Sequence, residues 1–236
     1  MQAPRDLYPF VARFRFFLVG LIALSLVFLG TAAIEMMDAW NRGWEASLAQ
    51  PLFVVDGLYL LGAIGFLICS VAAAWFWGRL VEAALQNADR FTAGEVPLPA
   101  NLAAWSHLVP VLWFWMPRQS LDMAYKSALG GRAWQSVEGH AGSRWWWSAW
   151  IVSGVLGTFN AVESVWVSFR TPSFFFGWTA DQINAWYTVS QGVYVFCTAL
   201  GSLSAVFLFR YLTLVQDAHV EALARFDVDQ GFLIES

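Results

Sequence analysis

Four long apolar segments, separated by polar stretches, divide the chain. They cover about residues 16–34, 57–77, 145–166 and 185–209. The first is uncharged throughout, and at about 1.5 Å per residue it is long enough to cross a hydrocarbon core of about 30 Å. Its basic flank and the small residues Thr31-Ala32-Ala33 imitate a signal peptide, but the apolar run is longer than a signal core, so we expect a retained helix. The pattern predicts an all-α membrane protein with four transmembrane helices in two hairpins.

The thirteen basic residues are distributed unevenly over the two sides that this topology creates. With both termini in the cytoplasm, only Arg42 and Arg170 lie outside. The other eleven lie inside: Arg5, Arg13, Arg15, Arg79, Arg90, Arg118, Lys126, Arg132, Arg144, Arg210 and Arg225. Cationic residues that flank membrane helices stay on the cytoplasmic side. The split therefore predicts the orientation, and with it a location in the bacterial inner membrane.

A fifth apolar stretch, residues 108–116, is short and contains Pro110. If it crossed the membrane, six basic residues would lie inside and seven outside, against the positive-inside rule. We therefore expect an interfacial or re-entrant element within a cytoplasmic segment of residues 79–144, and both alternatives stay open. Residues 210–236 form a predicted cytoplasmic tail, in which residues 212–226 are expected to form an amphipathic helix.

The second helix of each predicted hairpin leaves the membrane through a similar element. Residues 76–79 and 207–210 are aromatic or apolar residues that lead to an arginine, and a predicted amphipathic helix follows each, over residues 80–91 and 212–226. Duplication of one hairpin would explain this similarity. Shared rules for the inner ends of membrane helices would explain it equally well.

Composition agrees with a single membrane domain over residues 1–236. Hydrophobic residues make up 58% and charged residues 13%, against about 45–50% and about 25% in soluble proteins. A net charge of −4 excludes a generally basic nucleic-acid binder. Many of the tryptophans lie at the predicted membrane boundaries, as an aromatic belt does; they are Trp40, Trp44, Trp166, Trp178 and Trp186 outside, and Trp75, Trp77 and Trp145 to Trp147 inside.

Residues 76–147 carry a recognisable pattern. Trp105-Ser106-His107-Leu108-Val109-Pro110 is followed, seven residues after that proline, by Pro117-Arg118-Gln119-Ser120-Leu121-Asp122-Met123, and then by the cluster Arg144-Trp145-Trp146-Trp147. This resembles a bacterial membrane family known only as domain of unknown function 4328, in which two spans, a Pro-x6-Pro cytoplasmic segment and two more spans occur in this order. That family usually has Asn where this chain has Trp113, and Tyr where it has Arg118. The resemblance implies a fold and a location, and no activity.

Strong catalytic motifs are absent from the sequence. We find no Gly-rich phosphate loop, His-Glu-x-x-His, nucleophile elbow or Cys-x-x-Cys, so we expect no enzyme, cofactor or metal site. Cys69 and Cys197 are interpreted as packing residues. His107 is a weak candidate ligand for a metal or pigment, and an ordinary interfacial histidine is the preferred interpretation.

Two groups of residues remain as candidate sites. The first would contact partners or lipid headgroups on the cytoplasmic side: Trp105, Pro110, Trp113, Pro117, Arg118, Gln119, Arg79 and Arg144. The second is an outer polar site for a cation or proton, formed by Asn160, Glu163 and Asp56. The expected partners are membrane lipids and other integral membrane proteins, with no nucleic acid. An accessory or scaffolding subunit of a larger membrane complex is the preferred function, a small transporter or channel the alternative, and a membrane-embedded enzyme third.

Overall fold

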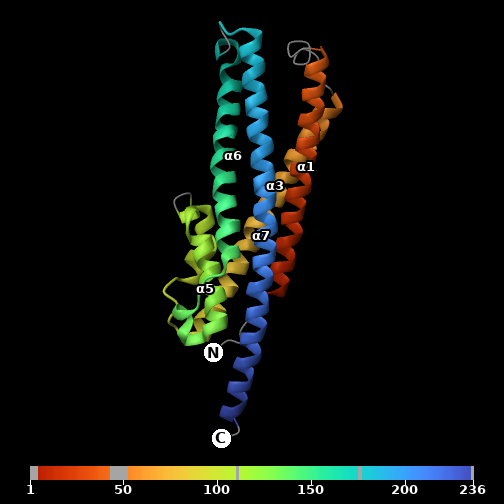
Figure 1. The fold of residues 1–236 in the computed structure, drawn as a ribbon. Helices are drawn as coiled ribbons and strands as arrows, with labels where there is room; N and C mark the ends of the chain where they lie inside the picture. Colours follow the sequence, from red (N-terminus) through yellow and green to blue (C-terminus); the bar gives the residue numbers. More distant parts are fainter. Residues whose placement is uncertain (1–4, 43–52, 110–111, 175–176, 235–236) are drawn as a thin grey trace. The chain divides into compact units, whose positions relative to one another are not determined.

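The computed structural model describes residues 5–42, 53–109, 112–174 and 177–234, and every regular element in these ranges is helical (Figure 1). The all-α prediction is confirmed. The helices are α1 (Tyr8–Arg42), α3 (Phe53–Phe91), α4 (Ala100–Trp105), α5 (Met116–Gly130), α6 (Ala141–Phe174) and α7 (Ala180–Ile234). Three short 3₁₀ turns accompany them: η1 (Ser106–Leu108), η2 (Leu112–Phe114) and η3 (Gly131–Ser136).

Three stretches of the described chain are helical, long enough and apolar enough to cross a membrane. They are Tyr8–Ile34 in α1, Leu60–Phe91 in α3 and Ala185–Arg225 in α7. They correspond to the first, second and fourth predicted spans. The third predicted span, residues 145–166, lies in α6, whose side chains are described only in part. Its role as a span stays a prediction.

The chain divides into two compact units. Unit 1 comprises residues 1–18, 70–147 and 205–236, and unit 2 comprises residues 19–69 and 148–204. Unit 1 contains most of the buried apolar residues, among them Leu80, Leu85, Leu121, Leu212 and Val215. Unit 1 therefore has a buried apolar core.

Small residues bring the helices of unit 2 together. A Cβ added to Gly62 would lie 3.0 Å from the ring of Phe28, and one added to Gly65 would lie 3.3 Å from Leu24. In the same unit the Ser153 hydroxyl donates to the carbonyl oxygen of Cys197 at 2.9 Å, linking α6 to α7. Close approach through small residues is how helices associate in lipid, where apolar faces gain nothing by meeting.

The outward side chains of unit 2 are large and apolar. Leu61 of α3 exposes 69% of its surface, and Phe159 of α6 exposes 70%. Exposed large apolar residues in this unit also include Leu26, Leu60, Leu67, Val152, Val189 and Phe196. Soluble proteins do not present apolar surface on this scale, since each such side chain would lose about 1.5–3 kcal/mol in water relative to burial. Unit 2 is thus suited to a hydrocarbon environment.

The two predicted amphipathic helices are not separate elements. Residues 80–91 are the end of α3, and residues 212–226 belong to α7, so neither helix breaks at the predicted span ends of 77 and 209. A proline or a run of turn residues would be needed to interrupt a helix there, and the sequence supplies neither. The apolar faces of both extensions are buried inside unit 1, at Val81, Leu85, Leu212 and Val215.

The predicted interfacial segment consists of short pieces. α4 has six residues, η1 and η2 have three each, and α5 begins directly afterwards and has 15 residues. Even α5 is only about 22 Å long at 1.5 Å per residue, less than the roughly 30 Å of a hydrocarbon core. Pro110 lies outside the described residues.

Candidate functional site

Local sequence signals define α5, the helix around which the candidate site is built. Pro117 occupies the first turn, where its missing N–H costs nothing, and Gly131 ends the helix with a φ of +53°. At the carboxyl end the Arg225 guanidinium of α7 donates to the carbonyl oxygen of Ala128 at 2.7 Å. This contact satisfies one of the carbonyls that a helix end leaves open.

A buried polar network joins α5 to α6 and α7 within unit 1. The Tyr211 hydroxyl donates to Asp122 Oδ1 at 2.6 Å, and the Ser143 hydroxyl donates to Asp122 Oδ2 at 3.1 Å. Arg118 Nε lies 3.5 Å from the same Oδ2. Tyr211 and Ser143 each expose only 1% of their surface. The Asp122 carboxylate is therefore held by three donors from three helices, which fixes the orientation of α5.

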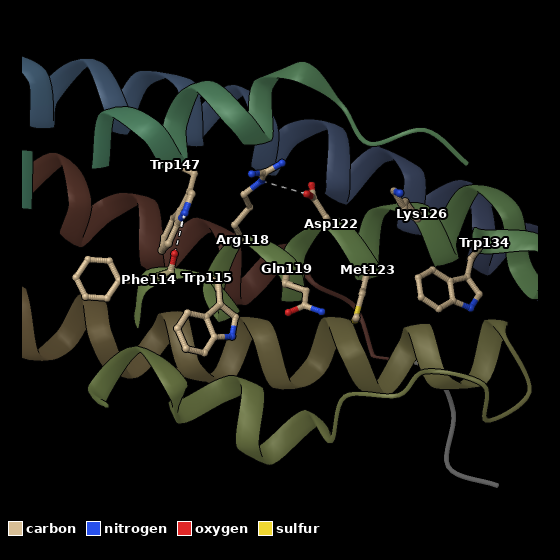
Figure 2. A pocket seen from close by; sticks show the side chains of 9 residues that line it. All are labelled: Phe114, Trp115, Arg118, Gln119, Asp122, Met123, Lys126, Trp134 and Trp147. Carbon is tan, nitrogen blue, oxygen red and sulfur yellow. Dashed lines mark hydrogen bonds and ion pairs between the residues drawn. The ribbon is translucent and has the colours of Figure 1, made fainter. Parts of the chain in front are cut away.

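A groove of about 480 Å³ runs along α5 inside unit 1 (Figure 2). Two rows of side chains from α5 and its N-cap residue line it. Arg118, Asp122 and Lys126 form a charged row, and the parallel row contains Trp115, Gln119 and Met123; residues four apart share a helix face. The remaining lining residues are Phe114, Trp134 and Trp147.

The two ends of the groove differ in chemistry. Figure 2 shows Phe114, Trp115 and Trp147 gathered at one end, and Lys126 and Trp134 at the other. The Trp147 indole N–H donates to the carbonyl oxygen of Phe114 at 3.1 Å and ties η2 to the beginning of α6. The Trp134 indole N–H is buried without a hydrogen-bond partner in the described structure. The site combines aromatic surface with two cations, Arg118 and Lys126, and one carboxylate, Asp122.

Three of the predicted cytoplasmic site residues meet in the first turns of α5. Arg118 and Gln119 line the groove, and Pro117 is buried beneath them. The sequence did not identify six other lining residues as members of this site: Phe114, Trp115, Asp122, Met123, Trp134 and Trp147. Residues 118, 122 and 126 are four apart, so on a helix they would share one face and could have been recognised as one site. No helix was predicted at these positions, and the spacing therefore went unused.

The other cytoplasmic candidates lie apart from the groove lining. The Trp105 ring packs on α3, 5.4 Å from the Trp75 ring, and a Cβ added to Gly78 would come within 3.1 Å of it. Arg79 forms an ion pair with Glu82 of its own helix at 2.7 Å. Arg144 is exposed near the start of α6. The side chain of Trp113 is not described.

The predicted outer polar site cannot be built from the described side chains. Asn160 and Glu163 belong to α6 and Asp56 belongs to α3, but the description of these three residues stops at the backbone. The cation or proton site therefore stays a prediction.

His107 lies half-buried in η1, with its ring 6.2 Å from that of Trp105. Burial lowers the pKa of His107, and the nearby backbone carbonyls of Ala104 and Ala74 oppose that shift. The neutral imidazole is therefore favoured. Within the described ranges no three His, Cys, Asp or Glu residues lie close enough together to hold a metal ion.

Comparison of the chain with family models, with curated proteins and with solved structures gave no match. The resemblance to domain of unknown function 4328 accordingly stays a prediction carried by the residues quoted for it.

Proposed function

We propose that this chain is a multi-pass protein of the bacterial inner membrane that acts as an accessory or scaffolding subunit of a larger membrane complex. In this proposal four spans in two hairpins hold unit 2 in the bilayer, both termini lie in the cytoplasm, and unit 1 provides a binding platform. The long apolar helices and the outward apolar side chains of unit 2 support the membrane location.

One observation carries the binding role: the short segment of residues 100–115, of which the structure describes 100–109 and 112–115, exposes large apolar side chains. They are Leu102, Leu108, Val109, Phe114 and Trp115. Two hydrogen bonds hold the backbone of this segment. The Ser106 hydroxyl donates to the carbonyl oxygen of Ala103 at 2.7 Å, and the Trp147 indole N–H donates to the carbonyl oxygen of Phe114. Exposed apolar groups on an ordered backbone are typical of surfaces that meet another protein or a membrane.

A photo-crosslinking amino acid at Leu108 tests the proposal in living cells. Tyr8, at the start of α1, is the matched control, because it exposes the same 62% of its surface as Leu108. We expect irradiation to join the Leu108 variant to one integral membrane protein in amounts comparable to the chain itself. The Tyr8 variant should not form that adduct.

The opposite pattern would count against an accessory role. If the Leu108 variant forms adducts with lipids alone, segment 100–115 lies on the bilayer rather than on a protein. If both variants capture the same mixture of abundant membrane proteins, the contact reflects crowding and the segment has no dedicated partner.

A further inference from the structure

The groove along α5 carries more positive charge than the structure neutralises. It contains two cations, Arg118 and Lys126, and one carboxylate, Asp122. Both oxygens of that carboxylate already accept hydrogen bonds from Tyr211 and Ser143, so it is turned toward α6 and α7. Among the described residues, Lys126 has no ion pair or hydrogen bond, although its side chain is half-buried. A lysine without a counterion, in a groove that also contains Arg118, favours binding of an anion.

The first turn of α5 adds to this preference. Its N-cap residue, Trp115, provides no side-chain hydrogen bond to the open backbone N–H groups. Such a helix end carries a partial positive charge and attracts anions. Arg118 and Gln119 project from the same turn and line the groove, so two polar side chains accompany the helix end.

The size and the aromatic end of the groove indicate what kind of anion fits. A volume of about 480 Å³ lies in the range of sites for organic molecules, roughly 300–1,000 Å³, and far exceeds the space that a phosphate ion needs. A bare ion would also leave the exposed rings of Phe114 and Trp115 in water. Trp147 at this end is followed directly by Ser148, with which α6 enters unit 2.

The geometry points to a binding site for an anionic phospholipid of the surrounding leaflet. Arg118 and Lys126 attract its phosphate, and Phe114, Trp115 and Trp147 receive its glycerol and acyl portion. This inference rests on the membrane location in the proposed function, and not on the existence of a protein partner. Single cations near an anionic lipid surface contribute enough to change an affinity about fivefold each.

Native mass spectrometry of the full chain in detergent, with added phosphatidylglycerol, measures this binding directly. Lys126→Gln removes one groove cation and breaks no hydrogen bond or ion pair among the described residues. Arg132→Gln is the matched control, because it removes the same charge from an exposed position outside the groove. We expect Lys126→Gln to weaken phosphatidylglycerol binding about fivefold and Arg132→Gln to leave it unchanged. Trp115→Ala should also weaken it.

Two further measurements distinguish a lipid headgroup from a free phosphate ion as the bound anion. Phosphatidylcholine with the same acyl chains should bind more weakly than phosphatidylglycerol, and excess inorganic phosphate should not displace the bound lipid. The site is refuted if Lys126→Gln and Arg132→Gln have equal effects, or if both lipids bind alike. Displacement by inorganic phosphate would assign the groove to a free ion. These outcomes leave the Leu108 crosslinking result untouched, so the two proposals fail separately.

Discussion

The Tyr211–Asp122 hydrogen bond gives the sharpest test of how unit 1 is held together. Tyr211→Phe removes one hydroxyl and keeps the ring in place. The lost bond is 2.6 Å long, reaches a carboxylate and comes from a tyrosine that exposes only 1% of its surface. Hydrogen bonds to charged groups contribute about 1.5–3 kcal/mol. Asp122 keeps its contacts with Ser143 and Arg118 in the variant, so we expect a loss of about 2 kcal/mol in the free energy of unfolding.

Thermal unfolding in detergent, followed by near-ultraviolet circular dichroism, measures this loss. For a chain of this length, 1 kcal/mol corresponds to about 2–4 °C, so Tm should fall by about 4–8 °C. Tyr8→Phe is the control, because it deletes the same hydroxyl from a largely exposed ring and should change stability by less than about 0.5 kcal/mol. Combining Tyr211→Phe with Asp122→Asn should cost clearly less than the sum of the two single changes. Equal Tm values for Tyr211→Phe and Tyr8→Phe would refute the reasoning.

Three further predictions concern the ends of helices and one histidine. Arg225→Ala removes the donor that covers the end of α5 at Ala128 and should lower the free energy of unfolding by about 1 kcal/mol, measured by the same melts, with Arg225→Lys losing less. Ala93→Gly should stabilise the chain by about 0.5–1 kcal/mol, because Ala93 has a φ of +56°, which is unfavourable for any residue with a Cβ; a lower Tm would contradict this. Burial lowers the pKa of His107 in the folded chain below the value of about 6.5 that it has in the unfolded chain. Below about pH 6.5 the unfolded chain therefore binds a proton that the folded chain does not, and the free energy of unfolding should fall as the pH drops. His107→Gln should flatten that pH dependence of Tm, and an unchanged slope would count against it.

The features that the sequence predicted correctly are those with a local cause. Long uncharged runs produce α1, α3 and α7, since a segment of that length and hydropathy has few other stable forms in lipid. The packing role of Gly62 and Gly65 can likewise be inferred from residue size alone. Neither inference requires knowledge of which helix lies next to which.

The groove could not be predicted because it depends on distant parts of the chain. Tyr211 and Asp122 are 89 residues apart, and Trp147 meets Phe114 across 33 residues. The helical continuation over residues 80–91 was predicted, but what its apolar face packs against was not. In the structure α5 packs against the helical extensions of residues 80–91 and 212–226. Its charged row, Arg118, Asp122 and Lys126, then lines the groove.

The claim that unit 2 lies in lipid while α5 and its surroundings lie outside the hydrocarbon is tested most directly by spin labels. Single nitroxide labels would be placed at Leu61 in unit 2 and at Arg132 in unit 1, both exposed positions, in lipid discs with the two native cysteines replaced by alanine. Relaxation by oxygen reports a hydrocarbon environment, and relaxation by a water-soluble nickel chelate reports an aqueous one. We predict strong oxygen and weak nickel relaxation at Leu61, with the reverse at Arg132. Equal nickel relaxation at the two positions would contradict the account.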